Sequence, residues 1–340
     1  MDLKHIKTQY DLNVYAESRI GGRKENQDSF GAADTPYGFL AVVCDGMGGG
    51  PAGKLASTIA VEAIIAYIKN VEIHKEAQSP GVMDATNGVV SEFAETTYDV
   101  KDASEHNGYV AQNDEKDSQI QDNSDIKTIV RDAIRFANKA IIGRGLEYEE
   151  LIGMGSTCVL VFVDEDCATI AHVGDSRVYQ FRGSKKVFRT FDHSMVFDLV
   201  KQKIITEEQA RLSAQSNVIT KCLGANLALE PEIAQVAYRR GDRFMLTTDG
   251  IHGVVPETEL ISMATNRSAS LGQVVDEIAT HIDGCGRIAG GGHDNLTIMM
   301  VETQSNSKMK SSRVGVRVLY FIIVAILLII SSIALYFVEF

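Results

Sequence analysis

The sequence lacks three features that would point to common classes of protein. Its five cysteines form no CxxC pair, and four lie in or beside apolar runs, as reduced thiols buried in a cytosolic domain do. The N-terminal residues MDLKHIKTQYDLN contain no apolar core, so we expect no secretory signal peptide. Basic residues are few: 33 Lys and Arg against 45 Asp and Glu give a net charge of -12. This balance argues against nucleic-acid binding, which requires clustered positive charge.

Large apolar residues are scarce between residues 72 and 125. This segment is rich in Ser, Asn, Gln and Asp, and its 13 acidic and 3 basic residues account for most of the net negative charge. Such a composition cannot bury enough apolar surface to form a core. We interpret 72–125 as a flexible acidic insertion, which is either a solvated loop or a regulatory, partner-binding segment.

The longest stretch without charge is VLYFIIVAILLIISSIALYFV, residues 318–338. Its 21 residues match the thickness of a bilayer, and Tyr320 and Tyr336 lie near its ends as interfacial aromatic residues do. A polar and basic linker, 303–317, precedes it. We therefore expect a C-terminal transmembrane helix with the preceding domain in the cytoplasm; the alternative is a buried core helix.

The remaining pattern predicts an α+β fold. Short turns such as 164–166 and 182–184 separate apolar segments, as in antiparallel hairpins. Strands are predicted at 12–20, 38–44, 157–163, 168–173, 177–181, 186–191, 232–238, 243–248 and 295–302. Helices are predicted at 51–69, 126–142, 194–202, 206–213, 256–265 and 271–282. Many antiparallel strands with a few helices between them favour a layered α+β architecture.

Four aspartates stand where apolar runs break. They are Asp28 in RKENQDSF, Asp45 in AVVCDGMGGG, Asp249 in FMLTTDGIHG and Asp294 in GGHDNLTIMM. A single Asp-Gly pair usually makes a turn. Four carboxylates delivered from separate strand ends can instead bind hard divalent cations, and two such cations can activate water for attack on a phosphoryl group.

Seven motifs along the chain carry a resemblance to a known family. They are GGRKENQD (21–28), VCDGMGG (43–49), GSTC (155–158), AHVGDSRVY (171–179), FDHS (191–194), TTDG (247–250) and GHDNLT (292–297). In order and spacing, 12–302 resembles the metal-dependent serine/threonine protein phosphatases, the PPM family (protein phosphatase type 2C), in their bacterial form. The resemblance implies a central antiparallel β-sandwich flanked by helices in four α-β-β-α layers, with the metals at one end.

The resemblance also implies a set of metal ligands for Mg²⁺ or Mn²⁺. Asp45 is similar to the aspartate that bridges two metals, and Gly46 would add a main-chain oxygen to the first. Asp249 and Asp294 resemble ligands of the second metal. Asp175 resembles the carboxylate that holds a third, weaker metal together with Asp249.

Two further residues receive catalytic roles from the resemblance. Arg23 resembles the phosphate-binding arginine, and Asp28 would act through metal-bound water. The chain departs from the family at Gln27, where some relatives have Glu, and at Met47, where animal members have a His proposed as general acid. The proton donor is therefore a metal-bound water or His193, unless His193 only packs the FDHS turn.

Two histidines within the motifs each allow two interpretations. His172 is either plain core or functional, and His293 either orients Asp294 or stabilises a turn. Residues 195–225 match the family's variable flap, which bears on substrate choice.

The function implied is metal-dependent hydrolysis of phosphoserine and phosphothreonine on cytoplasmic proteins by a membrane-anchored enzyme. Its partners would be phosphorylated proteins and a serine/threonine kinase. Two alternatives remain. One is a catalytically silent module that recruits phosphoproteins to the membrane, and the other is a hydrolase of a different phosphoester.

Overall fold

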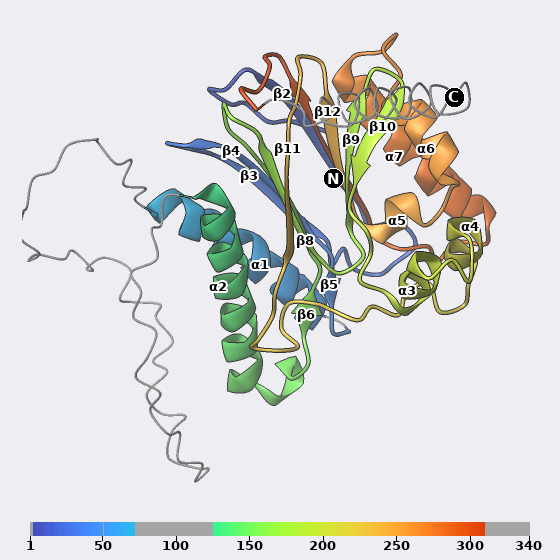
Figure 1. The fold of residues 1–340 in the computed structure, drawn as a ribbon. Coiled ribbons are helices and arrows are strands. Elements are labelled where there is room, and N and C mark those ends of the chain that lie inside the picture. Colours follow the sequence, from blue (N-terminus) through green and yellow to red (C-terminus); the bar gives the residue numbers. More distant parts are fainter. Residues whose placement is uncertain (1–2, 50, 72–124, 310–340) are drawn as a thin grey trace, which may run out of the picture.

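A computed structural model describes residues 3–49, 51–71 and 125–309 (Figure 1). The predicted transmembrane helix at 318–338 and almost all of the acidic insertion at 72–125 lie outside these ranges. Within them, strands and helices extend from Lys4 to Thr303.

Two antiparallel sheets form the centre of the molecule. The first has the order β1 (Lys4–His5), β2 (Leu12–Arg19), β13 (Leu296–Thr303), β12 (Arg243–Thr247), β9 (Arg177–Arg182) and β10 (Lys185–Arg189). The second has the order β11 (Glu232–Val236), β8 (Ala168–Val173), β7 (Cys158–Val163), β4 (Gly38–Cys44) and β3 (Ser29–Thr35). Apolar side chains from both sheets, among them Val14, Ala41, Val161, Leu246 and Met299, share one core. The predicted α+β fold with antiparallel sheets is confirmed.

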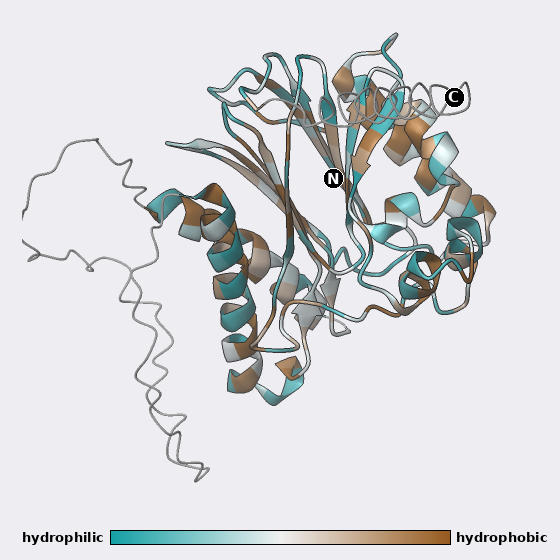
Figure 2. Cartoon of the chain, viewed as in Figure 1, coloured by the Kyte–Doolittle hydropathy of each residue, from teal (hydrophilic) through white to brown (hydrophobic). Residues whose placement is uncertain are grey.

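Helices cover the outer faces of both sheets (Figure 1). Helices α1 (Pro51–Asn70) and α2 (Ile126–Glu147) pack on β4, β7 and β8 through a second core. Helices α5 (Asp249–His252), α6 (Glu257–Ala264) and α7 (Leu271–Ile288) pack on β9, β12 and β13 through a third. In Figure 2 brown stretches run through the central strands beside teal and white ones, and the helices carry both teal and brown residues, as amphipathic helices on a core do.

Local sequence explains why these helices form. Helix α2 begins after Asp125, whose side chain accepts a hydrogen bond from the Lys127 backbone N–H, and it buries Val130, Ala133, Ala137 and Ile141 on one face. Among the described helices, α1 is the one long and apolar enough to suit a membrane. Its buried face packs against α2 and the second sheet, which accounts for its apolar composition.

Short elements connect the layers at one end of the sandwich. A two-stranded ribbon pairs β5 (Gly46–Met47) with β6 (Gly155–Ser156), and a 3-10 helix, η2 (Glu149–Leu151), precedes it. Helices α3 (Met195–Lys201) and α4 (Glu207–Arg211) lie within 195–225, the segment predicted as a flap. The sequence pattern does not predict strand β3, because SFGAADT contains one large apolar residue and the strand lies at a sheet edge.

Candidate metal centre and cleft

The structure brings the five predicted metal-site aspartates to one end of the sandwich. Asp28 precedes β3, Asp45 follows β4, Asp175 lies between β8 and β9, Asp249 begins α5, and Asp294 lies just before β13. Antiparallel pairing places the start of one strand beside the end of its neighbour, which gathers these positions. Asp45 interacts electrostatically with all four of the others.

Because the five carboxyl groups lie close together, ionising all of them at once is unfavourable. Loss of hydration and then repulsion from neighbouring carboxylates raise the pKa of Asp45 and of Asp249 well above the ordinary value. Burial raises the pKa of Asp28 to about 6. Burial, followed by repulsion from Asp192, raises the pKa of Asp175 to about 7. A divalent cation would relieve this repulsion, and oxygen-rich sites are the ones that Mg²⁺ and Mn²⁺ prefer.

Hydrogen bonds leave oxygens free at this end. The Thr248 and Thr297 hydroxyls donate to Asp28 Oδ2 at 3.0 and 2.6 Å. Among the described residues, Asp28 Oδ1 and Asp249 Oδ1 are buried and accept no hydrogen bond. Buried oxygens without a donor are unfavourable unless another group satisfies them. The residues present therefore fit a site for divalent cations.

The turn at Asp45 is held by its backbone. The Asp45 N–H donates to Thr157 Oγ1 at 2.9 Å, and its carbonyl accepts from Thr157 N at 2.8 Å and Ser156 Oγ at 2.9 Å. A Cβ on Gly46 would lie 1.9 Å from the Gly53 carbonyl oxygen of α1. Only glycine fits there, so α1 packs directly against the backbone that follows Asp45.

Arg23 and Asp294 contact each other at the edge of the site. Arg23 Nη2 donates to Asp294 Oδ2 at 2.8 Å, and the Arg23 side chain remains 49% exposed, so it can reach a ligand. The Asn295 N–H donates to Asp294 Oδ1 at 2.8 Å. Asn295 also donates to the carbonyls of Ile20 and Glu25, and thereby ties the Arg23 loop to β13.

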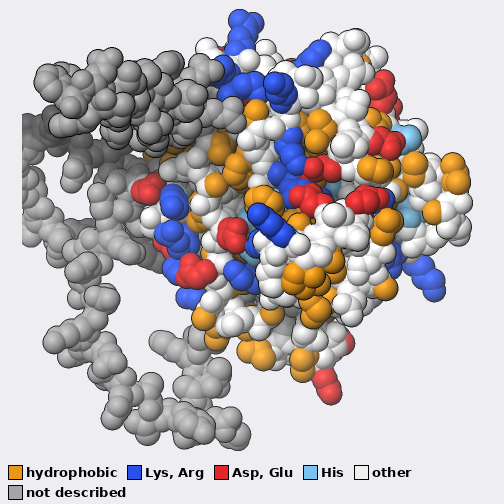
Figure 3. Space-filling model, turned by 45° about the vertical axis from the view of Figure 1, so that its right-hand side comes forward, with side chains coloured by type: hydrophobic (Ala, Val, Ile, Leu, Met, Phe, Trp, Pro, Cys, Tyr) orange, Lys and Arg blue, Asp and Glu red, His pale blue; other side chains and the backbone are white. Residues whose placement is uncertain are grey.

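A cleft of about 700 Å³ opens beside these residues. Its wall includes Arg23, Asp175, Asp249 and Asp294, whereas Asp28 faces a different hollow of about 610 Å³. The rest of the wall combines apolar and charged side chains of the flap and of the segment after α5, namely Val196, Phe197, Ala210, Arg211, Val254 and Glu257. Figure 3 shows acidic and basic side chains gathered next to a hydrophobic patch on the face turned forward.

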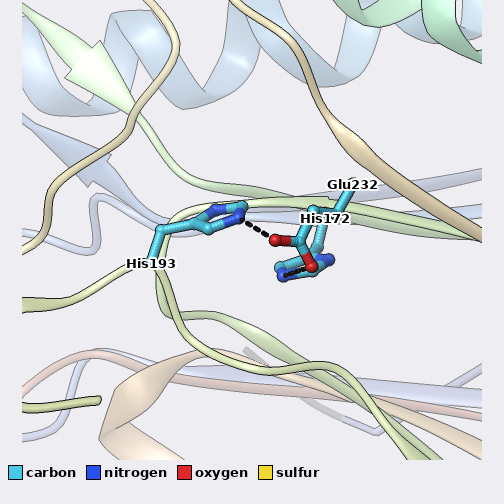
Figure 4. Close-up of side chains that lie close together, drawn as sticks. All are labelled: His172, His193 and Glu232. Carbon is cyan, nitrogen blue, oxygen red and sulfur yellow. Dashed lines mark ion pairs between the residues drawn. The ribbon is translucent and has the colours of Figure 1, made fainter. Parts of the chain in front are cut away.

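His193 does not line this cleft. Its ring stacks on His172 with centroids 4.6 Å apart, and both lie near Glu232 of β11 (Figure 4). Possible ligand atoms of these three residues lie within 4.8 Å of one another, close enough for a metal ion to bridge.

The hydrogen bonds of the two imidazoles argue against a metal in that cluster. His193 Nδ1 accepts from the Gly174 N–H at 3.1 Å, so Nε2 carries the hydrogen and points at Glu232 Oε1, 3.2 Å away. His172 Nε2 lies 2.8 Å from the Phe191 carbonyl oxygen and must donate to it. His172 Nε2 therefore donates to a carbonyl, whereas His193 Nε2 lies within ion-pair distance of Glu232 but makes no hydrogen bond within the described residues, and neither Nε2 offers a lone pair to a metal. The two histidines therefore stabilise the turn before Asp175. This role agrees with the interpretation that His193 packs a turn.

Several residues around the site were not singled out from the sequence. Thr248, Thr297 and Asn295 lie inside quoted motifs, yet their hydrogen bonds appear only when β12 and β13 are paired. Asp283 of α7 contacts His293, and no motif marks it. The one sequence feature that could have marked Asp283 is its position as a polar residue on the buried side of an amphipathic helix.

Comparisons with known proteins agree with this geometry. A family model described as protein phosphatase 2C matches residues 17–283. A putative protein phosphatase 2C-type of Streptococcus pyogenes serotype M6 is 28% identical over 86% of this chain and 98% of its own length. The serine/threonine phosphatase stp of Listeria welshimeri is 31% identical over 52% of this chain and 68% of its own.

Solved structures share the fold. The S. agalactiae serine/threonine phosphatase superposes with a TM-score of 0.64 at 24% identity, over 86% of this chain and 99% of that one. The catalytic domain of the phosphatase PstP, solved in complex with two manganese ions, gives a TM-score of 0.60 at 23% identity, over 86% of this chain and 97% of that one.

Proposed function

The chain belongs to the protein phosphatase 2C family, a family of serine/threonine phosphatases that depend on Mg²⁺ or Mn²⁺, and from this premise we propose that it dephosphorylates cytoplasmic phosphoproteins while anchored to a membrane. The observation that supports catalysis best is the cluster of five aspartates beside Arg23, with two buried carboxylate oxygens that accept no hydrogen bond within the described chain. A silent binding module would have no need for such mutual repulsion.

The side chains divide the chemical task. Asp45, Gly46, Asp249 and Asp294 would hold two cations, and Asp175 with Asp249 a third. Cations held by these residues would polarise a phosphoryl group and lower the pKa of water. Arg23 presents a planar guanidinium that binds phosphate through two parallel N–H donors, and its present contact with Asp294 keeps it close. Asp28, fixed by two threonine hydroxyls, directs its free oxygen as a hydrogen-bond acceptor for water.

The cleft suits a phosphorylated side chain and its neighbours in a peptide. Val196, Phe197 and Val254 provide apolar contact, and Arg211 lies on the same wall. Arg211 donates to the carbonyls of Gly253 and Val254 at 3.3 and 3.2 Å, which connects the flap to the segment after α5. The flap therefore forms one side of the substrate path.

The membrane anchor rests on the sequence of 318–338. The described chain is compatible with it, because residues after β13 leave from the end of the sandwich away from the aspartates. There Lys308 N and Met309 N donate to Glu165 and Asp166 carbonyls in the β7–β8 turn. The proposal also includes a partner serine/threonine kinase.

The test is release of phosphate from a phosphothreonine peptide by the full chain with and without Mn²⁺. We expect activity that disappears with chelator and in Asp249→Asn. The control Asp198→Asn changes an exposed flap aspartate outside the cleft wall and should keep activity. Turnover that survives chelation or Asp249→Asn would contradict the mechanism. Recovery of the full chain in the soluble fraction would contradict the anchor.

A further inference from the structure

Helix α7 contacts the loop that carries Asp294 through one side chain. His293 Nε2 lies 2.8 Å from Asp283 Oδ1, and because a carboxylate accepts, Nε2 carries the hydrogen. Asp283 is fixed in turn by Arg287, whose Nη2 donates to Oδ2 at 2.9 Å. The His293 side chain is only 9% exposed. The imidazole is therefore clamped against α7 in one orientation.

Gly286 provides the space for this ring. A Cβ built on Gly286 would lie 2.2 Å from His293 Cγ and 2.5 Å from Cδ2. Gly286 is buried inside α7, where glycine is otherwise an unfavourable helix residue. The helix thus lacks a side chain at the one place where the ring lies flat on it.

The backbone of His293 reaches the phosphate-binding loop. Its carbonyl accepts from Gly22 N–H at 2.9 Å, directly before Arg23. A Cβ on Gly21 would lie 2.0 Å from the Asp294 carbonyl oxygen and 3.2 Å from His293 Cδ2. His293 therefore lies between α7, the loop that carries Arg23 and the residue Asp294.

We propose that His293, clamped by Asp283 and seated on Gly286, is a positioning residue that fixes Asp294 and Arg23 relative to each other. Helix α7 then sets the separation between one metal ligand and the phosphate-binding arginine. This inference rests on the proposed function, because it assigns those two residues their tasks. The role is mechanical: the hydrogen bond and the ring's shape place the loop.

Three substitutions separate the parts of the clamp. His293→Phe keeps a ring but loses the donor, whereas His293→Gln keeps an N–H that can reach Asp283. Gly286→Ala places a methyl group where the ring lies. Glu277→Gln is the matched control, since Glu277 is exposed on the same helix and contacts neither His293 nor Asp283, whereas Asp276 shares Arg19 with Asp283.

The full-length protein is titrated with Mn²⁺ by calorimetry, and KM and kcat are measured on a phosphothreonine peptide at saturating Mn²⁺. For His293→Phe and Gly286→Ala we expect Mn²⁺ affinity to fall about 10- to 100-fold, the usual effect of removing a residue that orients a metal ligand. KM should rise as Arg23 shifts, and His293→Gln should recover much of both losses. In the double variant Gly286→Ala/His293→Ala, the Gly286 change should have little further effect, because the clash is gone.

Thermal melting distinguishes positioning from simple support of the fold. If His293→Phe and Gly286→Ala lower only the melting temperature and leave Mn²⁺ affinity and KM as in Glu277→Gln, the inference is overturned. If the wild-type chain binds Mn²⁺ but releases no phosphate, the proposed function fails instead, and the Mn²⁺ titrations still decide whether the clamp positions Asp294.

Discussion

Replacing Arg189 with Met should weaken both the fold and the flap. The Arg189 side chain is 3% exposed and donates to Glu207 of α4 at 2.7 and 3.1 Å and to Glu257 of α6 at 2.5 Å. Its guanidinium also lies 5.2 Å from the centroid of Phe197. It therefore joins β10 to the flap and to the helix after α5.

The expected loss of stability depends on the two carboxylates that remain when Arg189 is removed. Removing one partner of a fully buried ion pair costs about 3–5 kcal/mol. Glu207 and Glu257 remain 45% and 24% exposed, so water can solvate them after the change. We expect a loss of about 2–3 kcal/mol, because Met keeps part of the packing. For a domain of this size that is roughly 5–10 °C in melting temperature.

The assay is thermal unfolding of Arg189→Met beside Lys201→Met. Lys201 makes an exposed pair with Asp198 at 4.0 Å, which should contribute about 0.5 kcal/mol or less. A loose flap should also raise KM for a phosphopeptide more than for p-nitrophenyl phosphate. If Arg189→Met melts within about 2 °C of wild type, comparable to Lys201→Met, the network does not stabilise the domain as argued.

Two further predictions concern titration and charge. Burial lowers the pKa of His193 to about 4, so between pH 6.5 and 4 the unfolded chain binds a proton that the folded chain does not. The free energy of unfolding should fall as pH drops through that window, by about 2 kcal/mol at pH 5. Urea unfolding of His193→Gln should show a correspondingly weaker dependence of this free energy on pH. An equal pH dependence in wild type and variant would refute the prediction. Asp249→Asn replaces a buried carboxyl whose ionisation the folded site opposes, so without metal it should be more stable than wild type, by about 1–3 kcal/mol. Addition of Mn²⁺ should raise the melting temperature of wild type far more than that of the variant, and an equal rise in both would contradict the ligand role.

The sequence was most informative where an element is simple. The run GFLAVVC is buried along its whole length because β4 lies between helices and the opposite sheet, and an apolar run ending in Asp45 predicts such a strand. The convergence of the aspartates came from motif order, and pairing of β13 between β2 and β12 shows its physical origin. These pairings join residues almost 300 positions apart, which local patterns do not encode.

Other features depend on contacts that a linear pattern does not record. The edge strand β3 has little apolar character of its own and is fixed by pairing with β4. The partner of His293 lies on a helix ten residues earlier, and the partner of His193 lies on β11. Such pairs become visible only when helices and strands are packed together.

The exit of the chain beside the β7–β8 turn bears on which targets the enzyme can reach. Strands of six residues, β7 and β8, separate that turn from the aspartates, a height of roughly 20 Å. With the proposed anchor, the cleft beside the aspartates would face away from the lipid and toward the cell interior. Phosphoproteins that diffuse nearby would reach it more readily than phosphoresidues held flat against the bilayer.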